Sequence, residues 1–302
     1  MLQKTLFPGQ YLQGAGALNE LPVLVRLFGS RALLLASPSV LNSILPKWGS
    51  QLSSELFIRD QFRGECTEAE LQRVAESVRK LGCDLMIGMG GGKTIDTAKI
   101  VADREEIPVI VVPTIASTDA PCSGCAVTYS PEGVFEAVLY QKRNPAVVLV
   151  DLNIIASAPA RFLVSGMGDA LATWFEARSC HQTKSQNECG GHSTRTGLGI
   201  ARLCYEILMS EGHSARLANE KGLITPALGS VVEANILLSG IGFESCGIAC
   251  AHAVHNGLTA LKETHAYYHG EKVAIGVLTG LELTAASSQE IDEVYSYCEQ
   301  IG

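Results

Sequence analysis

A glycine cluster is the first stretch whose residues could do chemistry. Residues 84–99 have the sequence Asp-Leu-Met-Ile-Gly-Met-Gly-Gly-Gly-Lys-Thr-Ile-Asp-Thr-Ala-Lys, in which a short apolar run leads through glycines into a predicted helix. Glycine lets the backbone turn sharply and leaves its N–H groups uncovered, and the start of a helix carries a partial positive charge. These features favour an anion site, most often for phosphate. The alternative is a glycine-rich turn that binds no ligand.

Neither of two common phosphate loops matches this cluster. A Walker A loop has four residues between its first glycine and the Gly-Lys-Thr, whereas only three residues separate Gly88 from Gly92. The dinucleotide pattern G-x-G-x-x-G fails because Lys93 stands where the third glycine, counted from Gly88, should be. The loop therefore has the character of a phosphate site but belongs to neither class.

Histidines and one acid suggest a second site in the other half of the chain. The histidines are His181, His192, His213, His252, His255, His265 and His269. His252 is expected in the middle of an apolar helix of small residues, and His269 opens the next helix. Asp169 is expected to start a helix of small and apolar residues, where an unpartnered carboxylate is costly. One carboxylate, two imidazoles and an open position form a catalytic zinc arrangement, and core histidines with ordinary hydrogen bonds are the alternative.

The elements that would position the glycine cluster alternate between strand and helix. Short apolar runs predict buried strands over residues 31–36, 55–58, 85–88, 109–112 and 147–150. Spaced apolar residues predict a helix over 40–52 and another that follows a capping box of Thr67 and Glu70 and ends at Gly82. This alternation predicts a parallel sheet covered on both faces.

Polar clusters follow three of these strands. They are Ser37, the glycine cluster and residues 114–119. Ligands of such sheets bind beyond the carboxyl ends of the strands, so phosphates at the glycines and sugar hydroxyls at the flanking clusters would suit a dinucleotide. Residues 129–140 form a predicted hairpin with its turn at 131–133.

The composition changes after residue 159, where strand patterns give way to long helical ones over 191–209, 226–240 and 272–286. We therefore expect two domains: an α/β dinucleotide-binding domain over 1–159 and a helical, metal-binding domain over 160–302.

Composition excludes several partners. The net charge of −8 argues against nucleic acid and against an anionic membrane. The N-terminus has no apolar run of the signal-peptide kind, and no apolar stretch is expected to span a bilayer without interruption. Ten cysteines are scattered along the chain, with Cys122 and Cys125 in the one C-x-x-C. Reduced thiols in a cytoplasmic protein are the expected state.

Four motifs together resemble a known family. They are Gly90-Gly-Gly-Lys-Thr-Ile-Asp-Thr-Ala-Lys99, Pro113-Thr-Ile-Ala-Ser-Thr-Asp-Ala-Pro121, Ser165-Gly-Met-Gly-Asp-Ala-Leu-Ala-Thr173, and Ala251-His-Ala-Val-His-Asn-Gly257 with His269-Gly-Glu-Lys272. In this order they resemble the glycerol dehydrogenases of the iron-containing, or group III, alcohol dehydrogenase superfamily. The likeness runs from near the N-terminus to the end of the chain.

The resemblance implies a dehydroquinate synthase-like architecture with the active site in the cleft between the domains, NAD, and one Zn²⁺ per subunit. It implies that Asp169, His252 and His269 bind the zinc and, through it, the substrate. Asp119 would hold a substrate hydroxyl in catalysis. The remaining residues that it implies around the cofactor are Gly91, Gly92, Lys93 and Asp96 at the pyrophosphate, and Thr114, Ser117, Ser123, Cys125 and Tyr129 at the nicotinamide half.

Three departures from the family pattern stand out. Ser37 occupies the position of a common acid that would bind the adenosine ribose and repel a 2′-phosphate, so it too is expected at the cofactor. Gly124-Cys125 replaces the usual aliphatic and polar pair beside the nicotinamide. The chain stops at Gly302 and is expected to be shortened, because family members continue with further helices.

The function implied is hydride transfer from glycerol, or a similar vicinal diol, to NAD, which gives dihydroxyacetone. His255 could relay the proton or make a core hydrogen bond. The alternatives are an NAD- and zinc-dependent lyase resembling 3-dehydroquinate synthase and a non-catalytic NAD-binding chain. A small polyol substrate, a homo-oligomeric assembly, and no nucleic-acid or membrane partner complete the expectation.

Ser37 generates a first testable prediction. The chain should use NAD but discriminate against NADP less strongly than relatives with an acid at this position, because a serine does not repel a 2′-phosphate. Ser37→Asp should raise the ratio of kcat/KM for NAD over NADP. An unchanged ratio would show that discrimination lies elsewhere.

Overall fold

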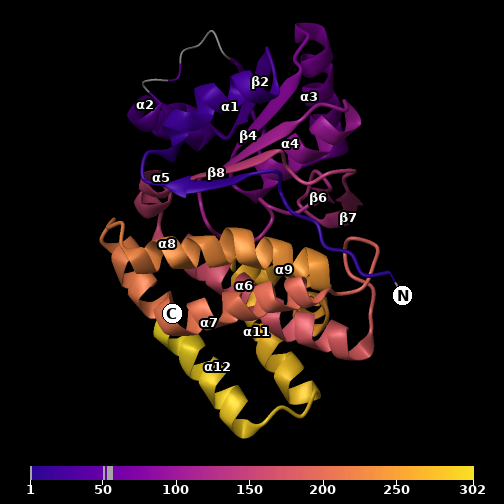
Figure 1. Cartoon of the computed structure of the whole chain (residues 1–302), viewed down its shortest axis with the longest axis vertical. Helices are drawn as coiled ribbons and strands as arrows, with labels where there is room; N and C mark the ends of the chain where they lie inside the picture. Colours follow the sequence, from indigo (N-terminus) through magenta and orange to yellow (C-terminus); the bar gives the residue numbers. More distant parts are fainter. Residues whose placement is uncertain (1, 50–51, 53–56) are drawn as a thin grey trace. The chain divides into compact units, whose positions relative to one another are not determined.

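The computed structural model describes residues 2–49, 52 and 57–302. The chain forms two compact units, which are taken one at a time (Figure 1). The α/β unit consists of Phe7–Ile115 and Ala120–Ile155. The helical unit consists of Ala156–Gly302 together with Ala116–Asp119 and the residues before Phe7. The short segment 116–119 thus interrupts the α/β unit in sequence but is built into the helical one.

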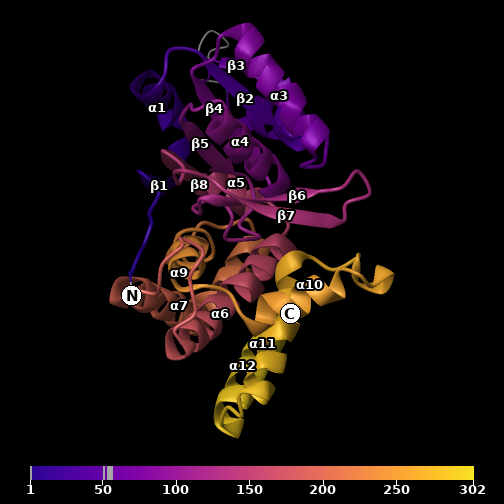
Figure 2. The ribbon, with the colours of Figure 1, turned by 90° about the vertical axis from the view of Figure 1, so that its right-hand side faces the viewer.

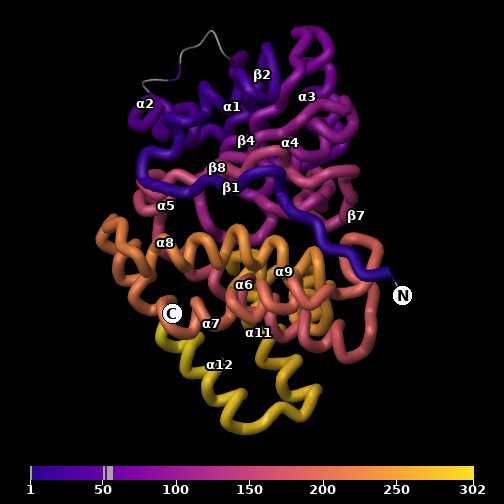
Figure 3. The backbone as a smooth tube through the Cα atoms, in the orientation of Figure 1, coloured from indigo at the N-terminus to yellow at the C-terminus, as the bar shows by residue number. Residues whose placement is uncertain are grey.

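The α/β unit is centred on a parallel six-stranded sheet, as the apolar runs predict. In spatial order its strands are β1 (Tyr11–Gly14), β8 (Val147–Asp151), β5 (Val109–Pro113), β4 (Leu85–Gly90), β2 (Ala32–Ala36) and β3 (Phe57–Gln61). The edge strand β1, which the sequence analysis missed, pairs with β8 (Figure 3). Its side chains are only half-buried, so it lacks the continuous apolar run of a central strand.

Helices cover both faces of this sheet (Figure 2). They are the 3₁₀ turn η1 (Ala17–Glu20), α1 (Leu21–Phe28), the π-helical turn η2 (Val40–Ile44) with α2 (Leu45–Trp48), α3 (Glu68–Leu81) and α4 (Gly92–Arg104). Leu21, Leu24 and Val25 of α1 share one apolar cluster with alternate residues of the central strands, such as Leu34 and Ile87. The opposite face carries α3 and α4. The predicted α/β fold with a parallel sheet is confirmed.

Several local expectations change in detail. The helix predicted over 40–52 ends at Trp48, and residues 50 and 51 lie outside the described part of the chain. Residues 55 and 56 of the second predicted strand do as well, and β3 extends it to Gln61. Thr67 caps α3 by accepting the N–H of Glu70 at 3.2 Å. The reciprocal half of the predicted capping box is wrong, because the Glu70 carboxylate accepts instead from the Arg63 N–H and from Arg73.

The predicted hairpin is present. Strands β6 (Cys125–Tyr129) and β7 (Phe135–Tyr140) pair in antiparallel fashion. The N–H of Gly133 donates to the Ser130 carbonyl at 2.9 Å and closes the turn, and Gly133 takes the left-handed φ of 79° that favours glycine there.

The helical unit follows the connecting helix α5 (Leu152–Ser157). Its helices are α6 (Ala160–Thr183), α7 (Arg195–Glu220), α8 (Pro226–Glu233), the π-helical turn η3 (Ala234–Leu238), α9 (Ser239–Cys246), α10 (Cys250–Leu258), the 3₁₀ turn η4 (Lys262–Thr264), α11 (His269–Leu283) and α12 (Ser288–Ile301). The helix predicted from residue 191 begins at Arg195, where Thr194 caps it, and runs to Glu220. The predicted helix 272–286 is α11, shifted by three residues.

Two expectations about the candidate metal residues are wrong. Asp169 does not start a helix but lies inside α6, nine residues after Ala160. His252 lies in the first turn of α10 and not at its middle. The small residues around both positions do not mark helix ends, because they serve the close packing described below.

Among the described residues, one helix is long and apolar enough to cross a membrane, Pro226–Cys246, with a mean hydropathy of 1.3. This differs from the prediction that no apolar stretch spans a bilayer without interruption. The protein buries 67% of that window, which is the burial of a core helix.

Gly88 generates a stability prediction. A Cβ at this position in β4 would lie 2.6 Å from the Ala98 Cβ on α4, so Gly88→Ala should overpack the contact and lower the free energy of unfolding by about 1–3 kcal/mol. Gly14→Ala is the control, because a Cβ there meets nothing within 4 Å, and its effect should stay within about 0.5 kcal/mol. Equal effects in urea unfolding would contradict the packing argument.

Candidate active site

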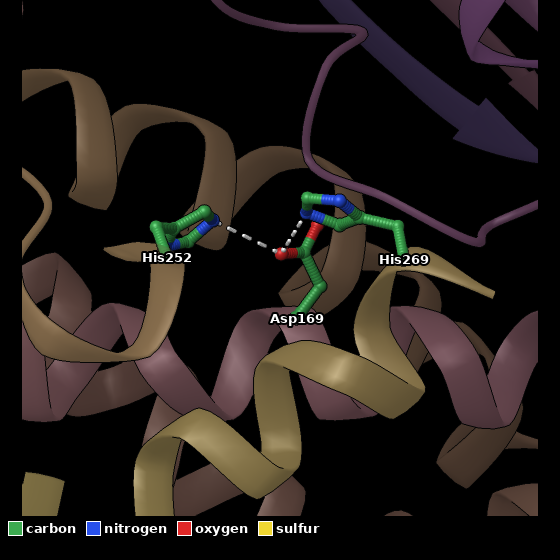
Figure 4. Close-up of side chains that lie close together, drawn as sticks. All are labelled: Asp169, His252 and His269. Atoms are coloured by element: carbon green, nitrogen blue, oxygen red, sulfur yellow. Dashed lines mark hydrogen bonds and ion pairs between the residues drawn. The ribbon is translucent and has the colours of Figure 1, made fainter. Parts of the chain in front are cut away.

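Three of the predicted residues converge in the helical unit. The Oδ1 atom of Asp169 lies 3.1 Å from Nε2 of His269 and 3.5 Å from Nε2 of His252 (Figure 4). One nitrogen or oxygen atom from each residue falls within 4.8 Å of the others. Asp169 is completely buried, whereas the His252 and His269 side chains keep 14% and 35% of their exposure. The cluster is therefore closed on the carboxylate side and open on the histidine side.

Small residues allow the three helices to approach closely enough for this. A Cβ on Gly270 would lie 1.7 Å from the Ser165 carbonyl oxygen of α6, so the start of α11 can contact α6 only with glycine there. A Cβ on Gly276 would lie 2.4 Å from the Ala251 carbonyl oxygen of α10. These two contacts bring His269 and His252 to Asp169. Each histidine is therefore positioned by a glycine of α11.

The charge of Asp169 is stabilised where it lies. Its Oδ2 atom accepts the backbone N–H of Asp119 at 3.2 Å. Desolvation acts to raise the pKa of the Asp169 carboxyl, but His269 and His252 outweigh it and hold that pKa well below its usual range. Desolvation likewise acts to lower the pKa of His252, and Glu176 and Asp169 outweigh it and raise that pKa well above its usual value. An ion bound here would have to displace a proton from the His252 ring.

Two further residues, Glu176 and His255, contact the histidines of the cluster. Neither contact is among the sequence-based predictions. Oε2 of the buried Glu176 lies 2.6 Å from Nδ1 of His252. Nε2 of His255 lies 3.0 Å from Nδ1 of His269. Burial, followed by the charge of His269, lowers the pKa of His255 to about 3. The spacing of seven residues from Asp169 to Glu176, two turns along one helix face, is the signal that could have found Glu176.

The three-residue cluster fits a metal ion. Nitrogen and oxygen ligands of a tetrahedral zinc site lie about 2.0–2.2 Å from the ion, and so about 3.3–3.6 Å from one another. The 3.5 Å separation between Asp169 Oδ1 and Nε2 of His252 falls in this range. The 3.1 Å separation between Asp169 Oδ1 and Nε2 of His269 is slightly shorter, at hydrogen-bond length. Two imidazoles and a carboxylate are also the donor types that zinc and ferrous iron take.

Asp119, the predicted substrate-binding residue, is built into the same unit. Its backbone N–H contacts Asp169, and its Oδ2 accepts the Ser239 hydroxyl at 3.1 Å. The Ser239 hydroxyl is in turn 2.8 Å from that of Thr173. No local pattern in the sequence points to Ser239 or Thr173 as partners of Asp119. Together they fix the orientation of the Asp119 carboxylate.

The residues predicted to bind the cofactor lie mainly in the α/β unit. Gly91 caps α4 and Gly92 begins it. Ser37 follows β2 and donates its N–H to the Met89 carbonyl at 3.2 Å, and Thr114 follows β5 and donates to the Gly90 carbonyl at 3.0 Å. Because β2, β4 and β5 are neighbours in the sheet, their carboxyl ends meet at one edge, as the sequence analysis expects of the polar clusters.

Lys93 and Tyr129 lie together beside this edge. The Lys93 ammonium is 2.5 Å from Glu65 and lies over the Tyr129 ring at 5.0 Å. Burial raises the pKa of the Tyr129 hydroxyl above its usual range, so Tyr129 is neutral. Glu65 is therefore a further charged group at the glycine cluster, and the sequence analysis did not include it.

Two side chains of α4, Lys99 and Asp96, form hydrogen bonds with the backbone of residues 120–127. The buried Lys99 ammonium donates to the carbonyls of Ala120 at 2.8 Å, Ser123 at 3.1 Å and Cys125. Asp96 Oδ2 accepts the Val127 N–H at 3.2 Å. Predicted cofactor residues Asp96, Ser123 and Cys125 thus all take part in shaping this loop.

Ser117 stands apart from the other predicted cofactor residues, because it belongs to the helical unit. There its carbonyl accepts the Ser165 hydroxyl at 3.3 Å. Cys122 and Cys125, the C-x-x-C pair, are not joined in a disulfide.

Comparisons with known proteins agree with this fold. The family model for iron-containing alcohol dehydrogenase matches residues 8–152. A glycerol dehydrogenase of Thermotoga maritima is 52% identical over 303 residues, covering 100% of this chain and 83% of the relative. A glycerol dehydrogenase of Pseudomonas putida is 49% identical, covering 98% of this chain and 81% of the relative. The crystal structure of a probable glycerol dehydrogenase from Sinorhizobium meliloti has a TM-score of 0.94 and 44% identity, covering 100% of this chain and 84% of that one.

The chain therefore belongs to the iron-containing alcohol dehydrogenase family. The predicted family, the predicted architecture and the prediction of an oxidoreductase are confirmed.

Proposed function

We propose that this enzyme oxidises glycerol, or a similar vicinal diol, to the corresponding hydroxyketone with NAD as the hydride acceptor and Zn²⁺ bound by Asp169, His252 and His269. The observation that carries the proposal is the convergence of these three side chains from three helices, with their ligand atoms within 4.8 Å. The names of the Thermotoga maritima and Pseudomonas putida relatives support glycerol as substrate. The lyase and the non-catalytic alternatives gain no such support.

In the proposed mechanism, a bound zinc ion supplies positive charge that lowers the pKa of a substrate hydroxyl. Asp169, His252 and His269 hold that charge at one point. Asp119 accepts a hydrogen bond from the neighbouring hydroxyl of the diol and so orients the carbinol carbon. The hydroxyl proton would leave to solvent, and a bound nicotinamide would supply the acceptor for the carbinol hydride. The N–H groups at Gly91 and Gly92 would hold the pyrophosphate of that cofactor, and the helix start would add partial positive charge.

We assign zinc, although the family name refers to iron, because hydride transfer requires no change in the oxidation state of the metal. Three protein ligands with a further open position are typical of catalytic zinc sites. Fe²⁺ accepts the same donor types, and reconstitution with each metal distinguishes them. Ten cysteines without a disulfide are consistent with a reducing, cytoplasmic location, which we include in the proposal with a homo-oligomeric assembly.

Metal removal tests the centre directly. A chelator should abolish NADH formation from glycerol, since the proposal assigns the stabilisation of the alkoxide to the ion, while NAD binding survives because its proposed residues lie mainly in the α/β unit. His252→Ala and His269→Ala should lower zinc content, measured by elemental analysis, together with turnover. His213→Ala is the control, because His213 contacts the Gln300 carbonyl near the end of the chain and not the cluster.

A chelated enzyme with full activity would overturn the metal assignment, and so would histidine variants that keep both zinc and turnover. Absence of NADH formation by the zinc-loaded wild type with every diol would instead leave the lyase and the non-catalytic chain as the remaining explanations.

Substrate choice tests Asp119. Asp119→Asn keeps the shape of the side chain but removes its charge, so it should lower kcat/KM at least tenfold, or about 1.4 kcal/mol, for glycerol and 1,2-propanediol. For a secondary alcohol without a second hydroxyl the loss should be smaller, because the lost contact is absent from that substrate. Equal losses on both substrate types would show that Asp119 acts only through the structure around Asp169.

A further inference from the structure

The ring nitrogens that face away from the proposed ion have partners of different charge. Figure 4 shows both Nε2 atoms directed at the Asp169 carboxylate. On the far side of each ring, Nδ1 of His252 meets the carboxylate of Glu176, whereas Nδ1 of His269 meets the imidazole of His255. A histidine can bind an ion through Nε2 only when its one proton lies on Nδ1. The partners on the far side therefore determine whether each ring can act as a ligand.

Glu176 is held so that it can only accept. Its Oε1 takes the backbone N–H groups of Ala249 at 2.8 Å and His252 at 3.0 Å, which leaves Oε2 for Nδ1 of His252 at 2.6 Å. The side chain is 3% exposed. Because both oxygens are occupied by donors at the start of α10, the carboxylate cannot turn away. An ionised carboxylate has no proton to give, so Nδ1 of His252 must carry the proton.

The contacts of His269 also favour a proton on its Nδ1, through a series of hydrogen bonds between uncharged groups. If His269 binds an ion through Nε2, its Nδ1 carries the proton and donates it to Nε2 of His255 at 3.0 Å. His255 must then carry its own proton on Nδ1, where the Asn256 side-chain oxygen accepts it at 3.1 Å. The donors and acceptors of this chain match at every step. It is satisfied by a neutral His255, in agreement with its burial.

We propose that Glu176 and His255 are positioning residues that fix His252 and His269 as Nδ1–H tautomers, so that both Nε2 lone pairs point at the ion, and that Glu176 adds a second negative charge beside that of Asp169. The inference rests on the metal centre proposed above. Hydrogen bonds of this kind orient metal-binding histidines and raise their basicity, and their loss typically costs 10–100-fold in metal affinity. It assigns His255 a hydrogen-bonding role in place of the proton relay.

Glu176→Gln is the decisive variant. The amide keeps the size of the side chain but has one acceptor oxygen and one NH₂ group. If the oxygen stays on the two backbone N–H groups, the NH₂ faces Nδ1 of His252 and forces the proton onto Nε2, which cannot then bind the ion. The Zn²⁺ dissociation constant, measured by competition with a chromophoric chelator, should rise 10–100-fold. In ¹⁵N-histidine NMR spectra at saturating Zn²⁺, one histidine should lose the pattern of a protonated Nδ1 with a coordinated Nε2.

Glu290→Gln is the matched control. Glu290 is also an acid of the helical unit, partly buried with 26% of its side chain exposed, but its partner is Arg178 at 2.6 Å, and it does not contact the histidines. Its Zn²⁺ affinity should equal that of the wild type. His255→Gln, which keeps an acceptor, should bind Zn²⁺ more tightly than His255→Leu, which does not, and this pair tests the second half of the proposal even if Glu176→Gln fails to fold by circular dichroism.

Wild-type Zn²⁺ affinity and an unchanged histidine spectrum in Glu176→Gln would overturn the inference while leaving the metal centre in place. An equal loss of affinity in Glu290→Gln would overturn it too, because the effect would then follow from removing any acid of this unit. A wild-type chain that binds no Zn²⁺ would overturn the proposed metal centre itself, and the two failures are thus distinguishable.

Discussion

The helical unit depends on one buried carboxylate. Asp169 is completely removed from solvent in the middle of α6, where an unpartnered charge would cost several kcal/mol. The Asp119 N–H and the two imidazoles offset that cost, and each comes from a different segment of the chain. Their convergence is possible only because glycines at the start and in the middle of α11 let it contact α6 and α10 directly. The geometry of the Asp169 cluster and the packing of α6, α10 and α11 therefore depend on each other.

The α/β unit uses a buried charge in a comparable way but with opposite sign. Lys99 is 2% exposed, and its ammonium donates to two backbone carbonyls of the loop that precedes β6 and to that of Cys125, the first residue of β6. Buried backbone carbonyls need hydrogen-bond donors, and the ammonium supplies one to each of the three, with the Ser123 hydroxyl as a second donor to those of Ala120 and Cys125. In both units a charged side chain thus fixes the backbone of a segment that has no regular structure of its own, and the functional residues predicted from the sequence lie on or beside those segments.

The sequence could predict features that are encoded locally. Apolar runs located the central strands, and the glycine cluster located the start of α4, because strand burial and helix starts leave short-range patterns. The sequence could not place Asp169 correctly in its helix, since small residues that serve helix contact resemble those near a helix end. It could not find Glu176 or Lys99 as partners, because their roles depend on atoms of other elements. The half-buried strand β1 was missed because it has no continuous apolar run. The capping box failed because the Glu70 carboxylate binds the charged Arg73 side chain.

The placement of residues 116–119 has a consequence for how the protein is made. The chain passes between its two units four times, and this segment leaves the ribosome in the middle of the α/β unit. Asp169, whose carboxylate accepts the Asp119 N–H, is synthesised 50 residues later, and Ser239, whose hydroxyl binds the Asp119 side chain, 120 residues later. At a synthesis rate of about 5–20 residues per second, about 6–24 s pass between the synthesis of Asp119 and that of Ser239. During synthesis the sheet can therefore form while residues 116–119 still lack their partners in the helical unit. The contact of Asp119 with Ser239 forms only when α9 has been synthesised.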